Sequence, residues 1–233
     1  MAKLIVNDIE IELIKKDIKN IHLSVHPPNG RVRISVPKKM DDEAIRLFVI
    51  SKLSWIKKQR SKFEKQERQP EREFVSGESH YFLGKRYLLN VIYTNKEKQG
   101  VKICNNTYMD LFVKEGSTRE QRQKVLKEWY RQELKSLIPP LIEKWEPIIE
   151  VHVKSWGVKS MKTKWGSCNI NAGRIWVNLE LAKKNPACLE YIIVHEMVHL
   201  LERLHNKHFI SYMDKFLPNW RSIKAELNGL IFE

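Results

Sequence analysis

The segment His195-Glu196-Met197-Val198-His199 brings two imidazoles and a carboxylate together within five residues. Two histidines four residues apart project from one face of a helix, where both can reach a zinc ion. Glu196 lies at the edge of that face, so its carboxylate can take the proton of a zinc-activated water and later deliver it to a leaving amine. The spacing predicts a catalytic zinc site with His195 and His199 as ligands and Glu196 as general base.

Two protein ligands rarely suffice for zinc, so a third is expected where the chain turns back after the helix. His205 follows His199 at the six-residue spacing of the long zincin motif, and His208 is the alternative. Glu202 stands where that motif has glycine, and Asn206 could instead supply the left-handed cap of the helix. A helix whose histidines only satisfy core hydrogen bonds is disfavoured, because burying such groups without a metal is costly. We expect one zinc ion per chain, with His205 as the preferred third ligand.

Two segments before this helix are candidates for binding a substrate. Lys164-Trp165-Gly166-Ser167-Cys168 is a compact loop, and Arg174–Asn178 is a predicted strand beside the metal helix. A strand edge in that position could pair with an extended peptide, although a plain core strand is the alternative. Cys168 is disfavoured as a fourth zinc ligand, because it would close the position that water requires. The candidate substrate-binding residues are Trp165, Ser167, Arg174, Asn178 and His208.

These residues together resemble the YgjP-like metallopeptidases, which are relatives of the SprT-like zinc proteases. The resemblance extends nearly end to end and implies zinc held by His195, His199 and His205, with Glu196 as general base, acting on a protein or peptide substrate. Leu204 is a departure, because the family usually has Asn there. The oxyanion-stabilising donor stays open. The resemblance is carried by Trp55-Ile56, Gly77-Glu78, Leu83-Gly84, Lys164 to Cys168, Asn178 and His195 to His205. The candidates for stabilising the oxyanion are His208, Lys164, Arg174 and Tyr212.

The elements that must position this site form an α+β pattern. The first forty residues alternate as half-buried strands, and a long basic helix follows from Asp41 or Asp42 to about Gln69-Pro70. A second group of strands precedes a helix from about Thr118 that is expected to end at Pro139-Pro140, with a further short helix to Pro147. Asn185-Pro186 predicts the start of the metal helix, which runs to about Leu201. The predicted strands are 9–13, 22–25, 31–36, 81–83, 87–93, 101–103, 109–113, 159–161 and 174–178.

This pattern predicts two parts, a strand-rich region with long basic helices over residues 1–150 and a zincin-like catalytic domain over residues 151–233. An apolar fraction of 42% with 30% charged residues indicates a packed globular protein. No segment has the length and apolarity of a signal peptide or membrane span, and three widely spaced cysteines suit a reducing compartment. We therefore expect a cytoplasmic protein without membrane contact.

A formal net charge of +14 makes contact with nucleic acid plausible, because basic surfaces release counterions from phosphates. A solvated helix face explains the same residues without a partner. The alternative to the enzyme is accordingly a basic nucleic-acid-associated module whose metal site is structural or vestigial. Much of the charge lies in one stretch, which contains Lys52, Lys57, Lys58, Arg60, Lys62, Lys65, Arg68 and Arg72.

Overall fold

The computed structural model describes residues 2–26, 29–65, 72–95 and 98–229, and it confirms the α+β class. The chain divides into two compact units, Met1–Pro70 and Glu71–Glu233. None of the helices within the described ranges is long and apolar enough to cross a bilayer. The metal motif, His195 to His199, lies in the second unit.

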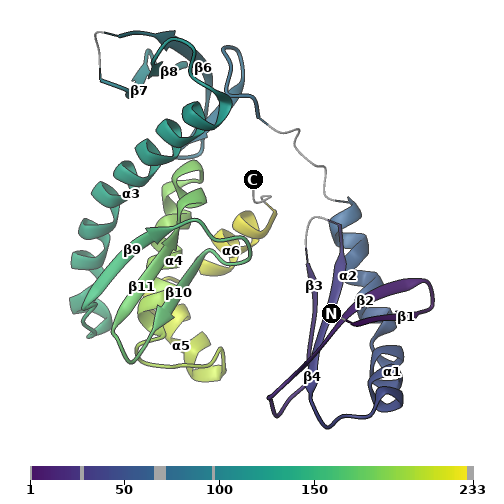
Figure 1. The fold of residues 1–233 in the computed structure, drawn as a ribbon. Coiled ribbons are helices and arrows are strands. Elements are labelled where there is room, and N and C mark those ends of the chain that lie inside the picture. Colours follow the sequence, from purple (N-terminus) through teal and green to yellow (C-terminus); the bar gives the residue numbers. More distant parts are fainter. Residues whose placement is uncertain (1, 27–28, 66–71, 96–97, 230–233) are drawn as a thin grey trace. The chain divides into compact units, whose positions relative to one another are not determined.

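The first unit is a four-stranded sheet with two helices over one face (Figure 1). Alternate residues of its strands are buried, as the period-two pattern predicted, and they pack against Ile45, Val49 and Ile56 of the helices. The strand order is β1-β2-β4-β3. The first strand was not predicted. The elements are β1 (Ala2–Val6), β2 (Ile9–Lys16), β3 (His22–His26), β4 (Arg31–Pro37), α1 (Asp42–Ser51) and α2 (Leu53–Lys65).

The predicted long helix of this unit is two helices. The side chain of Asp41 caps α1 by accepting hydrogen bonds from the backbone of Glu43 and Ala44. The helical pattern is interrupted at Lys52, which is the C-cap of α1, and α2 begins at the next residue. The predicted helix end near Pro70, and the basic side chains from residue 62 to residue 71, lie outside the described residues.

A second sheet of four strands, in the order β5-β6-β8-β7, begins the second unit. Leu83 and Gly84 join its first two strands with positive φ angles of 49° and 79°. This turn lies against the start of the metal helix: the Leu83 amide donates to the Ala182 carbonyl at 2.9 Å, and a Cβ on Gly84 would lie 3.2 Å from the Cα of Asn185. The strands are β5 (Ser79–Phe82), β6 (Lys85–Tyr93), β7 (Gly100–Cys104) and β8 (Tyr108–Val113).

The longest helix is α3 (Arg119–Ile149), which begins at a capping box formed by Thr118 and Gln121. The prediction that it ends at Pro139-Pro140 is wrong, because the helix continues through both prolines and through Pro147. Prolines remove backbone donors, but the buried side chains of α3 recur every three or four residues across the interruption and hold it against the core. These buried residues are Leu126, Tyr130, Leu134, Ile138, Ile142, Trp145 and Ile149.

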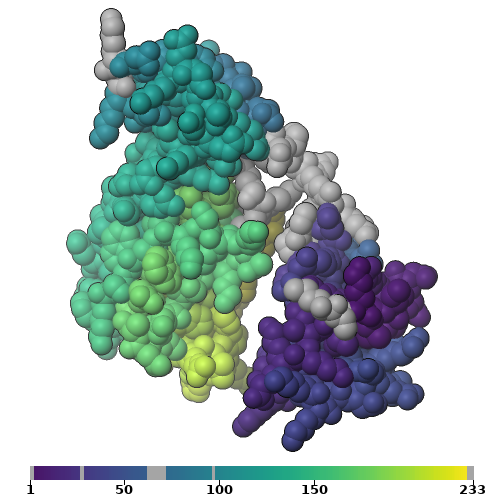
Figure 2. Space-filling view, in the orientation of Figure 1, coloured from purple at the N-terminus to yellow at the C-terminus, as the bar shows by residue number. Residues whose placement is uncertain are grey.

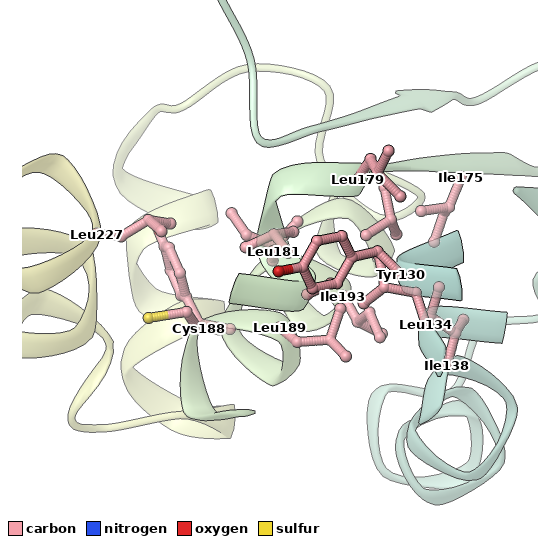
Figure 3. Close-up of a cluster of buried hydrophobic side chains, with 14 of the residues drawn as sticks. Tyr130, Leu134, Ile138, Ile175, Leu179, Leu181, Cys188, Leu189, Ile193 and Leu227 are labelled. Carbon is pink, nitrogen blue, oxygen red and sulfur yellow. The ribbon is translucent and has the colours of Figure 1, made fainter. Parts of the chain in front are cut away.

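Residue 150 is therefore not a boundary between the compact units. One core cluster extends from Phe74 to Leu227, and α3 joins the second sheet to the helices and strands after it (Figures 1 and 3). In the space-filling view, the teal atoms of α3 and the green atoms beyond residue 150 form a continuous body (Figure 2). The predicted division at residue 150 differs from the observed one because contacts across a long helix cannot be recognised from local pattern.

The last part of the chain forms a three-stranded sheet and three helices around the metal motif. The order β10-β11-β9 puts the strand Arg174–Asn178 in the middle, so it is not the edge that we expected to receive a peptide. The edge beside it is β10, which includes most of the predicted loop. The elements are β9 (Ser155–Lys159), β10 (Gly166–Asn169), β11 (Arg174–Asn178), a 3-10 helix (Leu179–Lys183), α4 (Pro186–Val198), α5 (Lys207–Phe216) and α6 (Trp220–Gly229).

Candidate metal centre

The helix α4 carries the metal motif through the middle of the core. Asn185 caps it by accepting a hydrogen bond from the Ala187 amide at 3.0 Å, and Pro186 occupies the first turn, as predicted. Side chains on all of its faces are buried, including Cys188, Leu189 and Val194. The helix ends at Val198, just before the second histidine of the motif, so the chain can turn there.

The loop after α4 returns a third histidine to the first two. The Glu202 carboxylate accepts a hydrogen bond from the Leu204 amide at 3.1 Å, which tightens the turn. Asn206 caps α5 by accepting from the Phe209 amide at 3.0 Å, so it starts the next helix rather than ending α4. His205 lies directly before this cap.

His195, His199 and His205 form a group in which one nitrogen of each ring lies within 4.8 Å of the others. The Nε2 atoms of His195 and His205 are 3.0 Å apart. Two imidazole nitrogens bound to one tetrahedral zinc would lie roughly 3.3 Å apart, so the rings need little adjustment to bind the ion. His208 lies on the exposed side of α5, outside this group.

Hydrogen bonds and burial prepare these rings as ligands. The Nδ1 of His199 lies 3.1 Å from the Glu202 carbonyl, which can only accept, so Nδ1 carries the proton and Nε2 presents its lone pair. The Nδ1 of His195 is buried without a hydrogen-bond partner among the described residues. Glu202 thus orients the His199 ring through its backbone, whereas its carboxylate shapes the loop.

The local electrostatics favour the neutral forms of His195 and His205. Burial, followed by the neighbouring His199, His205 and Lys224, lowers the pKa of His195 to about 3. Burial likewise lowers the pKa of His205. Burial raises the pKa of Glu196, of which 5% is exposed, to about 8, against the opposing charge of Lys164. A carboxylate whose affinity for protons lies near neutral pH suits a group that must accept and release one.

The edge strand β10 passes very close to Glu196. A Cβ built on Gly166 would lie 2.6 Å from the Glu196 Oε1 atom, 2.9 Å from its Cγ and 2.8 Å from the Ile192 Cγ2 atom. No side chain larger than hydrogen fits at these distances without movement of its neighbours. Gly166 therefore permits the approach that places the strand against the carboxylate.

The predicted substrate-binding residue Asn178 has a different place in the structure. Its side chain is fully buried, and its Nδ2 donates to the carbonyls of Lys164 at 2.7 Å and Met161 at 2.9 Å. Its Oδ1 accepts from the Glu180 amide at 3.3 Å. Asn178 therefore holds the loop that leads into β10 and is not available to a ligand.

Aromatic side chains that the sequence analysis missed surround the histidines. The ring of the buried Phe209 lies 4.7 to 4.9 Å from those of all three histidines. Tyr191 lies edge-on to His195 at 5.7 Å and stacks with Trp220 at 6.4 Å. The position of Phe209 three residues after a capping Asn could have indicated its inward orientation, but nothing local places it beneath the triad.

The histidine group opens into a cleft of about 1150 Å³. All four residues of β10 line it, and so does Trp165. The candidates Trp165 and Ser167 therefore lie at the cleft, and their binding of a substrate stays a prediction. Neither Arg174, which lies over the Trp176 ring at 5.5 Å, nor His208 lines the cleft. Tyr212 also lies outside it, which leaves Lys164 as the cleft-lining member of the oxyanion candidates.

Comparisons with known proteins identify the family of this chain. Residues 19–230 match the family model described as YgjP-like, metallopeptidase domain. A crystal structure of the metallopeptidase zymogen of Pyrococcus abyssi abylysin is similar at 18% identity and a TM-score of 0.36, over 38% of this chain and 89% of that chain. That likeness is too slight to support an argument about residues. No match was found among curated proteins. Since the family model covers most of the chain, the protein belongs to the YgjP-like metallopeptidase family.

Proposed function

We propose that this protein is a zinc-dependent peptidase that hydrolyses amide bonds of a protein or peptide, with one zinc ion per chain. The observation that carries the proposal is the meeting of three imidazoles, from His195, His199 and His205, beside the buried carboxylate of Glu196 in an open cleft. Three protein ligands leave a position for chemistry, whereas structural zinc sites usually have four. Family membership supports the same reaction class.

Zinc bound by these imidazoles would supply Lewis acidity toward the amide carbonyl. Glu196 is the base that takes a proton from the attacking water and then delivers it to the departing amine. Its burial and its contact with Gly166 hold the carboxylate in one place. The free edge of β10 is suited to pair with an extended peptide, because the whole strand lines the cleft and pairs only with β11 among the described strands.

Replacement of Glu196 tests the proposed base. Glu196→Gln keeps the size of the side chain but removes its ability to accept the proton, so we expect at least a hundredfold loss of peptide hydrolysis with zinc content unchanged. The assay measures hydrolysis of a mixed peptide library by mass spectrometry, beside metal analysis of the same samples. Hydrolysis that persists in Glu196→Gln would contradict the role of this carboxylate.

The third ligand can be tested with a matched pair of histidines. His205→Ala should lower the stoichiometry or affinity of zinc, whereas His208→Ala should leave both near the wild-type values, because His208 lies outside the triad. The measurement is zinc titration against a competing chelator. Equal zinc binding by the wild type and His205→Ala, with loss in His208→Ala, would reverse the assignment.

The nucleic-acid-associated alternative has less support. It requires a structural or vestigial metal site, and the three-ligand group beside a buried glutamate favours catalysis instead. Lys57 and Lys58 are exposed on α2, but solvated lysines on a helix need no nucleic-acid partner. Contact with nucleic acid stays a prediction that is based on the net charge alone.

A further inference from the structure

The cleft beside the histidine group is lined by positive charge from three separate segments. Lys164 precedes β10, Arg203 lies in the loop after α4, and Lys224 lies on α6. Glu196 is the one carboxylate among the described residues that line the cleft, and it is buried. A peptide entering the cleft therefore meets a surface with an excess of cations.

The ammonium of Lys224 lies over an aromatic ring. Its Nζ lies 5.3 Å from the centre of the Trp220 ring. That ring is fixed in turn, because its Nε1 donates to Asp214 at 2.8 Å and its face stacks with Tyr191. Lys224 thus projects from a rigid aromatic support.

The ammonium of Lys224 has no carboxylate within 4 Å among the described residues. Asp214, which accepts the hydrogen bond of the Trp220 ring, pairs with Arg221 instead. Lys224 nevertheless lines the same cleft as His195 and His205, the predicted metal ligands. A cation in this position, without a counter-ion in the part of the chain that the structure describes, is available to an anionic group of a bound molecule.

We propose that the cleft selects peptides that carry a carboxylate near the scissile bond and that Lys224 binds this carboxylate. The inference rests on the proposed peptidase function and adds the chemical class of its substrate. Lys164 and Arg203 strengthen the preference through the positive potential of the cleft. The carboxylate is that of an acidic side chain or of the C-terminus of the substrate, and both present the same chemistry to an ammonium.

Equilibrium binding tests this inference without depending on hydrolysis. The protein is the full-length, zinc-loaded Glu196→Gln variant, which should retain ligands without cleaving them. The probes are four fluorescently labelled peptides of one sequence, with Glu or Gln at one position and a free or amidated C-terminus. Fluorescence anisotropy at low and high salt gives the four dissociation constants.

We expect the preferred carboxylate to tighten binding by about three- to tenfold at low salt, and less at high salt, because exposed ion pairs are modest and screened. A gain that follows Glu assigns the site to an acidic side chain, and a gain that follows the free C-terminus assigns it to a chain end. Lys224→Met should remove the gain and Lys224→Arg should keep it. Lys162→Met, the same change outside the cleft, should leave it intact.

Equal binding of all four peptides, or a carboxylate preference that survives in Lys224→Met, would overturn the inference. A uniform loss of affinity for acidic and neutral peptides in Lys224→Met would do the same, because it would show a general role in place of selection. These results are separate from those on the proposed function. Peptide hydrolysis by the wild type, and its loss in Glu196→Gln, decide whether the protein is a peptidase whatever the binding preference.

Discussion

Gly166→Ala is the smallest change that should disturb the proposed base without touching a metal ligand. Gly166 does not have the positive φ that disfavours other residues, so alanine adds no backbone strain. Its effect must arise from the new methyl group. That group would lie against the side chains of Glu196 and Ile192 on α4.

The size of the effect follows from the distances. Ordinary van der Waals contact of a Cβ begins at 3.4 Å. The new methyl carbon would therefore lie about 0.8 Å too close to the Glu196 Oε1 atom and about 0.6 Å too close to the Ile192 Cγ2 atom. Overpacking of this kind costs about 1–3 kcal/mol of folding free energy. A catalytic group displaced by nearly 1 Å loses on the order of a hundredfold in rate, so we expect a tenfold to hundredfold fall in kcat.

The assay compares Gly166→Ala with Gly100→Ala. Gly100 also lies in a strand without a positive φ, and a Cβ there would meet nothing within 4 Å. Urea denaturation gives the free energy of unfolding, metal analysis gives zinc content, and peptide hydrolysis gives kcat. Only Gly166→Ala should lose stability and kcat while keeping its zinc. If it stays within twofold of the wild-type kcat and as stable as Gly100→Ala, the close contact does not position Glu196.

The remaining predictions concern Asn178, two cysteines and the proposed zinc ion. Asn178→Ala should lower the free energy of unfolding by about 2–4 kcal/mol in urea denaturation, because the carbonyls of Met161 and Lys164 lose the hydrogen bonds that the Asn178 side chain donates. Burial raises the pKa of Cys168 and of Cys188 to about 11, so iodoacetamide should modify both slowly at pH 8 in the folded protein and rapidly in urea, as followed by mass spectrometry. Because these pKa values are raised on folding, the stability they contribute should be lost as the pH rises from about 9 to about 11. Chelation of zinc should lower the midpoint temperature of thermal unfolding. Free zinc at about a hundred times its Kd should raise the free energy of unfolding by about 2.7 kcal/mol relative to the metal-free protein.

The parts of the structure that could be predicted depend on short stretches of sequence. The cap of α4 at Asn185 needs only its own first turn, and the alternation of Ile9, Ile11 and Leu13 needs only one strand. The histidine group was predicted because His195 and His199 share a helical face and His205 follows within one short loop. In each case the interacting residues are close in sequence, so spacing specifies geometry.

The parts that could not be predicted depend on pairing between distant segments. The middle position of β11 follows from parallel pairing with β9, which no local pattern indicates. The continuation of α3 through Pro139 depends on core residues supplied by other elements. Likewise, Gly166 has an ordinary strand conformation, and only its contact with α4 requires a glycine.

The metal helix is thus positioned from three directions by segments far apart in the chain. At its start, the turn at Gly84 lies so close that the backbone of Asn185 leaves little room for a side chain. At its middle, Gly166 permits β10 to reach Glu196, and beyond its end Phe209 packs beneath the histidines. A helix held in this way cannot rotate or slide without breaking a contact at another point. In the proposed mechanism Glu196 must stay aligned with the three histidines, so these contacts make the second unit as a whole, from β5 to α6, the frame of the proposed active site.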